Sequence, residues 1–187
     1  PQPCGPVRPA TRETGRASSL TAAACPHGPA ETTTSVHVYN LARTPRPLRL
    51  AAQAHATRLL AIAGVRVTWV DCGDSGMSSH RGGVSAAPLP AHDRILRLLR
   101  GHRTTDPRTL GFSYVPGVLA TALVDRVDEM ARRTHVPAAP LLGAVIAHEI
   151  RHVLFGGSHA SSGFMSPVWA ETDVSGASPV WLTRRPG

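Results

Sequence analysis

The stretch P-A-A-P-L-L-G-A-V-I-A-H-E-I-R-H-V-L-F-G-G, residues 137–157, decides the fold because it is the longest helical pattern in the chain. Its prolines fall where the first turn of a helix tolerates them, and the pair Gly156-Gly157 ends the pattern. Apolar residues flank the few polar ones on nearly every side, as in a helix that lies inside a core. We therefore predict a long buried helix over Pro137–Phe155.

Besides Arg151, three polar residues interrupt this apolar helix: His148, Glu149 and His152. His148 and His152 are four apart, so their imidazoles project from one face and can share a metal ion. Glu149 lies beside such an ion, where a general base for a water molecule belongs. Burying these three side chains without a partner would be costly. The pattern predicts a Zn²⁺ site with His148 and His152 as ligands and Glu149 as the catalytic residue.

Two imidazoles do not complete a catalytic zinc site, which normally has three protein ligands and a water. His159 comes seven residues after His152, beyond a glycine pair that lets the chain reverse. Glu171, at the spacing where some zinc enzymes supply a glutamate from a second helix, and Asp173 are competing candidates. Nearby prolines and a glycine disfavour that second helix, so we expect His159 to be the third ligand.

The run H-E-I-R-H-V-L-F-G-G-S-H-A-S-S-G-F-M, residues 148–165, resembles the signature of the metzincin superfamily of zinc peptidases. That signature is H-E-x-x-H-x-x-G-x-x-H followed by a methionine turn. The resemblance implies that Glu149 is the base and proton shuttle, that Met165 is the hydrophobic floor under the metal, and that the zinc ligands are His148, His152 and His159. The glycine and the third histidine each come one residue later than in the signature.

The preceding sequence predicts alternating strands and helices. Strands are expected at Ser35–Leu41, Val65–Val70, Ile95–Leu99, Leu110–Val115 and Val118–Val124, and helices at Leu48–Ala63 and Asp125–Thr134. Gly64 should end the first helix, and the two strands around that helix should pair in parallel. The periodicity of Ile95–Leu99 also permits a short helix.

These elements predict an α+β fold. The resemblance implies a metzincin-like arrangement, with a mixed, mainly parallel, twisted sheet of four to five strands, a backing helix and a long active-site helix. It also implies that Leu110–Val115 is the antiparallel edge strand along which a peptide or protein substrate lies. The expected function is zinc-dependent hydrolysis of a peptide bond.

The chain of 187 residues is long enough for one domain with a hydrophobic core and too short for two domains that each have a sizeable core. Residues 1–33 contain almost no bulky apolar side chains, so we expect a disordered tail or a processed segment. Residues 34–187 are expected to form the zinc metallopeptidase-like domain. We expect a monomer that is secreted or associated with the cell envelope.

The net charge is +8, and every one of the 20 basic residues is an arginine. They are scattered without a stripe or an aromatic platform, so we expect no nucleic acid partner. The densest stretch, Arg94–Arg108, leaves open a second hypothesis: a non-catalytic, zinc-stabilised binding domain that touches polyanions. No apolar run approaches the length of roughly 18–20 residues needed to cross a bilayer, so we expect no transmembrane segment.

The cysteines and the other histidines are not spaced in the sequence as they are in known metal or catalytic motifs. Cys4, Cys25 and Cys72 are an odd number without a C-x-x-C pair, which is compatible with one disulfide and one free thiol. The other histidines are expected to lie at the surface, or in the core with their ring nitrogens hydrogen-bonded. Trp169 could form a wall of a substrate pocket.

Overall fold

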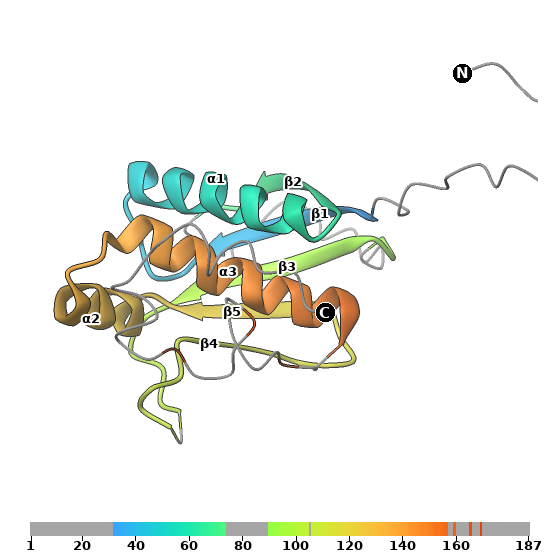
Figure 1. The fold of residues 1–187 in the computed structure, drawn as a ribbon. Helices are drawn as coiled ribbons and strands as arrows, with labels where there is room; N and C mark the ends of the chain where they lie inside the picture. Colours follow the sequence, from blue (N-terminus) through green and yellow to red (C-terminus); the bar gives the residue numbers. More distant parts are fainter. Residues whose placement is uncertain are drawn as a thin grey trace, which may run out of the picture.

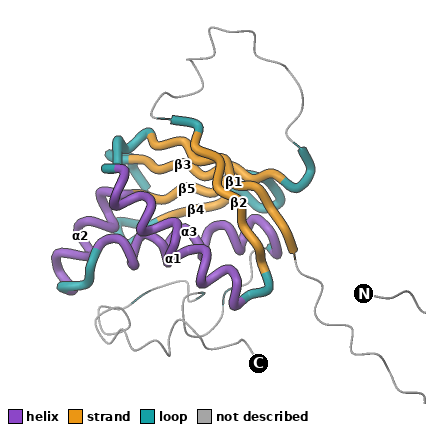
Figure 2. The backbone as a smooth tube through the Cα atoms, turned by 90° about the horizontal axis from the view of Figure 1, so that it is seen from above, coloured by secondary structure: helices purple, strands orange, loops and turns teal. Residues whose placement is uncertain are grey.

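The computed structural model describes residues 32–73, 90–104 and 106–156, together with His159, Met165 and Trp169. This part of the chain has two layers, a five-stranded sheet and a layer of helices on one of its faces, as Figures 1 and 2 show. Most of the predicted tail at residues 1–33 lies outside the described residues, but Thr32 and Thr33 already belong to the first strand.

The elements follow the predicted order. They are β1 (Thr32–Asn40), α1 (Arg46–Ile62), β2 (Val65–Asp71), β3 (Asp93–Leu99), β4 (Gly111–Ser113), β5 (Leu119–Leu123), α2 (Val124–Thr134) and α3 (Ala138–Phe155). The strands lie in the order β2-β1-β3-β5-β4, and β4 alone runs antiparallel to its neighbour. The predicted α+β fold with a mixed, mainly parallel sheet is confirmed.

Several predicted boundaries were wrong by a few residues. β1 begins at Thr32 because its threonines, which are β-branched and suit a strand, pair with the start of β2. Val124 opens α2 instead of ending a strand. β4 is only three residues long, since the chain turns towards β5 soon after Ser113. Ile95–Leu99 lies in a strand, so the alternative of a short helix was wrong.

The buried core between the layers is aliphatic. Val36 and Val38 of β1 alternate inward and are fully buried, and every residue of α3 from Leu141 to Ile150 is buried. α1 and α3 approach closely at Gly143, where an added Cβ would lie 2.6 Å from the Ala52 carbonyl oxygen. The absent side chain therefore lets α3 pack tightly against α1 and fixes its position over the sheet.

By length and composition, α3 is also the one helix in the described part of the chain that could cross a membrane. The expectation that no apolar run reaches that length was therefore wrong. In this structure 67% of α3 is buried inside the protein, as expected of a core helix. Its apolar surface serves the packing of the two layers.

Candidate metal centre

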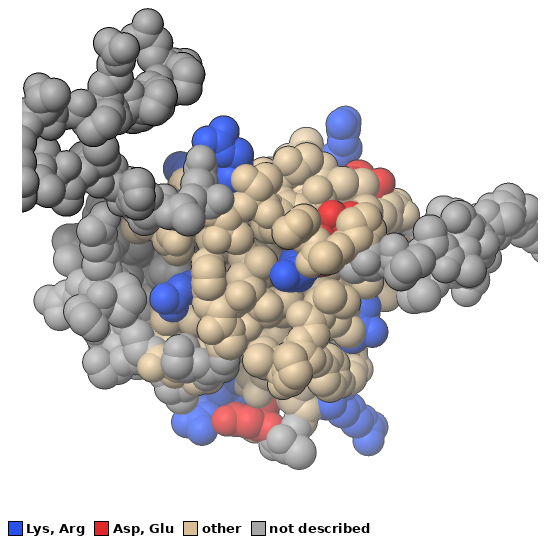
Figure 3. Space-filling model, turned by 90° about the vertical axis from the view of Figure 1, so that its right-hand side faces the viewer, with Lys and Arg blue, Asp and Glu red and all other residues tan. Residues whose placement is uncertain are grey.

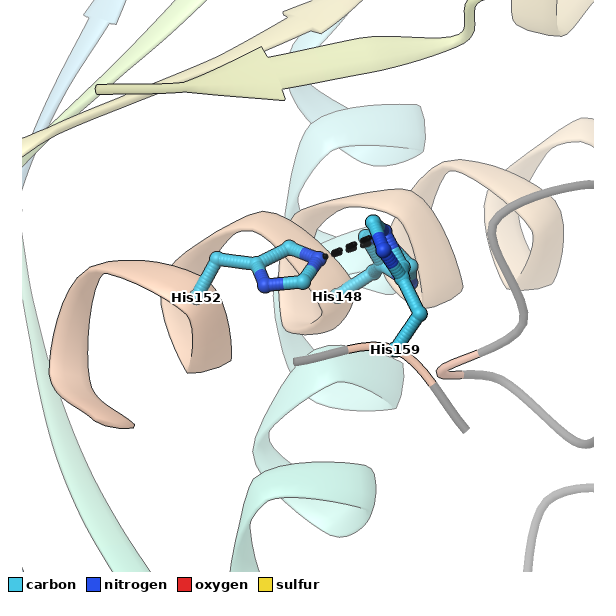
Figure 4. A group of neighbouring side chains, drawn as sticks. All are labelled: His148, His152 and His159. Carbon is cyan, nitrogen blue, oxygen red and sulfur yellow. Dashed lines mark hydrogen bonds between the residues drawn. The ribbon is translucent and has the colours of Figure 1, made fainter. Parts of the chain in front are cut away.

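Three imidazoles converge at the C-terminal end of α3 (Figure 4). His148 and His152 project from the helix, and His159 approaches from the segment that follows it. The Nε2 atom of His152 lies 3.0 Å from Nε2 of His148 and 3.1 Å from Nε2 of His159. The structure thus brings together the three residues that the sequence predicted as ligands.

This spacing is close to what a zinc ion requires. With Zn–N bonds of about 2.0–2.1 Å in a tetrahedron, two ligand nitrogens lie about 3.3 Å apart. Three neutral imidazoles also form a donor set that suits Zn²⁺. His148 and His152 are more than nine-tenths buried, whereas His159 is exposed. The residues present therefore fit one zinc ion with an open side.

The end of α3 orients one of these rings. His152 Nδ1 lies 3.1 Å from the carbonyl oxygen of Gly156, to which an Nδ1–H donates. The proton on Nδ1 leaves the lone pair on Nε2, the atom that faces the other histidines. Gly156 takes a φ of 93°, a backbone conformation that glycine adopts readily. The predicted helix stop thus also sets the tautomer of a ligand.

Glu149 lies beside the cluster and is buried, with only 6% of its surface exposed. Burial raises the pKa of its carboxyl from 4.5 to about 7, while a hydrogen bond from Ser113 of β4 opposes that shift. A bound divalent cation would favour the ionised form and lower this pKa again. In the metal-free protein, burial therefore brings the protonation of this carboxyl close to neutral pH.

Gly111 of β4 makes room for this carboxyl. A Cβ at position 111 would lie 2.9 Å from Glu149 Oε1 and 2.8 Å from the Thr121 carbonyl oxygen. Gly111 and Ser113 were not among the site residues predicted from the sequence. A glycine inside a strand often marks a close approach, so Gly111 carried a signal, whereas nothing in the sequence distinguished Ser113.

A cleft of about 460 Å³ opens over the histidines and Glu149. Its walls come from β4, from the segment before it, and from Met130 of α2, Val145 of α3 and Trp169. Trp169 packs edge-on to His148, with ring centroids 5.8 Å apart. Trp169 thus lines this cleft, whereas the prediction that the cleft binds a substrate stays a prediction.

The other predicted site residues have different outcomes. Met165 is buried in the hydrophobic core, with 4% of its surface exposed. Glu171 and Asp173, the competing third ligands, lie outside the described residues. The face in Figure 3 carries arginines separated by neutral surface. That distribution agrees with the absence of a basic stripe in the sequence.

The fold and the site together define an α+β domain with a three-histidine metal centre. No protein-family model matches the sequence, and no curated protein matches it. The chain is similar in structure to a zinc-dependent peptidase from Methanocorpusculum labreanum, with a TM-score of 0.49 and 16% identity over 70% of this chain and 87% of that one. It is also similar to an archaemetzincin from Methanopyrus kandleri, with a TM-score of 0.46 and 18% identity over 81% of this chain and 90% of that one.

Proposed function

We propose that this protein is a metzincin-like, zinc-dependent peptidase. The observation that carries the proposal is the convergence of three histidine Nε2 atoms beside a buried glutamate, at the base of an open cleft. His148, His152 and His159 would hold the zinc ion. When bound, the ion would polarise the carbonyl of the substrate and make a water molecule more acidic.

Glu149 would move the proton. It follows a ligand on the helix, so its carboxylate lies beside the metal position and is free to accept a proton from the attacking water. It would then donate that proton to the leaving amine. Burial favours its neutral form, and Ser113 favours its ionised form, so both states needed for a shuttle are accessible.

The substrate would lie along β4 as an added strand. Leu110 and Tyr114, on either side of β4, hydrogen-bond to the β5 side. Alternation then directs the backbone N–H and C=O groups of Gly111 and Ser113 away from β5, towards the open edge of the sheet. Such an edge accepts an extended peptide through main-chain hydrogen bonds. The scissile bond would thereby be presented to the metal centre.

The test is cleavage of a varied peptide library, read by mass spectrometry, with zinc-loaded and metal-free wild type. We expect cleavage by the zinc-loaded protein alone. Glu149→Gln should retain zinc and lose activity by about 10²–10⁴-fold, the range that a positioned base contributes. Glu129→Gln, which alters an exposed carboxylate on α2, is the matched control and should keep full activity.

The alternative, a zinc-stabilised binding domain without turnover, predicts a different result. Tight zinc binding with no cleavage of any peptide would support that alternative and exclude the peptidase. Equal activity in Glu149→Gln and wild type would show that another group moves the proton.

A further inference from the structure

A second group of reactive side chains lies on the face of the sheet opposite α1 and α3. His37 of β1 alternates with Val36 and Val38, which are fully buried beneath the helices, so its ring projects from the other face. Asp93 begins the neighbouring strand β3, and Cys72 follows the last residue of β2. The metal centre uses none of these residues.

These three side chains form a chain of contacts. His37 Nε2 lies 2.7 Å from Asp93 Oδ2, and His37 Nδ1 lies 3.8 Å from the sulfur of Cys72. The side chains of His37 and Asp93 are 23% and 15% exposed, and Cys72 is half-buried. The group is therefore packed firmly enough to hold its geometry, yet remains open to a small molecule.

The carboxylate determines which nitrogen of His37 can act as a base. A carboxylate only accepts hydrogen bonds, so the imidazole proton lies on Nε2, between His37 and Asp93. The lone pair of Nδ1 then faces the thiol. This order of nucleophile, base and orienting acid is the one that activates cysteine and serine nucleophiles in enzymes.

We propose that Cys72 is a nucleophilic thiol that exchanges with small disulfides, with His37 as its base and Asp93 as the residue that positions His37. The sulfur attacks one sulfur of the disulfide, and its proton passes to His37 Nδ1. The S–S bond of the small molecule breaks as the new S–S bond to Cys72 forms. The departing thiolate takes the proton from His37 and leaves as a thiol, so the disulfide is reduced as Cys72 is oxidised.

A disulfide suits this group better than an ester or amide. Thiol–disulfide exchange needs an attacking sulfur and an acceptor for its proton, both of which are in place. Acyl transfer would also need donors for a developing oxyanion.

Tyr39 lies beside the sulfur: burial, and then the neighbouring Cys72, raise the pKa of its hydroxyl, which keeps the phenol neutral. In the resting state, the thiol can donate a hydrogen bond to the Val70 carbonyl oxygen, 3.8 Å from the sulfur.

The test uses the full chain with Cys4→Ser and Cys25→Ser, so that Cys72 is the one thiol. The probe is 5,5′-dithiobis(2-nitrobenzoic acid), and its reaction rate is measured with folded protein and again in denaturant. Burial alone would make the folded thiol slower than the unfolded one. We expect the folded thiol to be faster, and His37→Gln to slow it by roughly 100-fold, the lower end of what a positioned base supplies.

Asp93→Asn should also slow the folded protein, because an amide can donate to Nε2 and shift the ring proton to Nδ1. Glu129→Gln, which alters an exposed carboxylate on α2 in the helical layer, is the control and should have little effect. Thermal unfolding and zinc binding verify that each variant folds, and Asp93→Asn carries the test if His37→Gln does not fold. A folded thiol slower than the unfolded one, or a rate unchanged by the folded His37 and Asp93 variants, would overturn the proposal.

Discussion

The two halves of the metal centre are built in different ways. His148 and His152 lie on a buried helix, four residues apart, and are fixed by the packing of α3 against α1 and the sheet. His159 is exposed and lies beyond the helix end at Gly156. A pair held by a packed helix loses little conformational freedom on binding, whereas an exposed side chain outside the helix is expected to lose more. The helix pair should therefore hold the ion, and His159 should adjust its affinity.

The largest expected effect is at the helix pair. His152→Ala should lower zinc affinity by roughly 100–1,000-fold, because structural zinc sites bind with about 10–16 kcal/mol shared among four ligands. Competition with a fluorescent chelator measures the change. His92→Ala, which removes an exposed histidine outside the site, is the control and should bind zinc like wild type. Unchanged affinity in His152→Ala would place the ion elsewhere.

The metal-free helix should also be sensitive to pH through Glu149. Burial raises the pKa of this carboxyl from 4.5 to about 7, so the fold favours its neutral form. Its contribution to stability is therefore complete below about pH 4.5 and is lost as the pH rises through about 7, by about 3 kcal/mol. Because the side chain of Glu149→Gln cannot ionise, this variant should not show that pH-dependent loss of stability.

Denaturant unfolding of the metal-free proteins at several pH values measures that difference. Burial lowers the pKa of His152, so this residue contributes in the opposite direction in both proteins, and the difference between them isolates Glu149. The Glu129→Gln control should follow wild type. Parallel stability curves for wild type and Glu149→Gln would show that the carboxyl is not desolvated.

A smaller effect is expected at the loop ligand. His159→Ala should lower zinc affinity by roughly 10–100-fold, less than His152→Ala, because two preorganised ligands remain. The same chelator competition compares it with Glu171→Ala, which should leave the affinity unchanged. If instead Glu171→Ala weakened zinc binding and His159→Ala did not, the metzincin-like ligand set would be wrong.

The smallest effect is expected on β4. Ser113→Ala removes the hydrogen bond that lowers the pKa of Glu149, so that pKa should rise. The acidic limb of the pH profile of kcat/KM should then move to higher pH, by roughly one unit or less, the value of a single hydrogen bond. Ser35→Ala, on the opposite face of the sheet, should leave the profile unchanged. A shift to lower pH would contradict this role for Ser113.

The difference between residues on one helix and residues beyond it also explains which features could be predicted from the sequence. Local periodicity was sufficient for α3 and for the pair His148 and His152, because a helix converts four-residue spacing directly into a shared face. The alternation of apolar and polar residues also predicted most strands. It did not predict the start of β1 at Thr32, because the threonines there lie in a polar segment and become part of the strand by pairing with β2. Tertiary pairing, rather than local pattern, set that boundary.

Local sequence patterns could not predict the contacts between distant segments. Gly111 and Ser113 act on Glu149 from a different strand, and Asp93 lies 56 residues from His37. The spacing of His37 and Cys72 in the sequence carries no signal, and only the parallel sheet brings them together. Their proximity depends on the strand order β2-β1-β3, which sequence periodicity does not determine.

The central claim is that one zinc ion lies between a helix-borne pair and a single histidine beyond the helix. A crystal structure of the zinc-loaded protein, with anomalous diffraction at the zinc edge, tests it most directly. We predict one ion bound to Nε2 of His148, His152 and His159, with the carboxylate of Glu149 close by but not coordinated. A carboxylate in the place of His159, or Glu149 bound to the metal, would contradict the account.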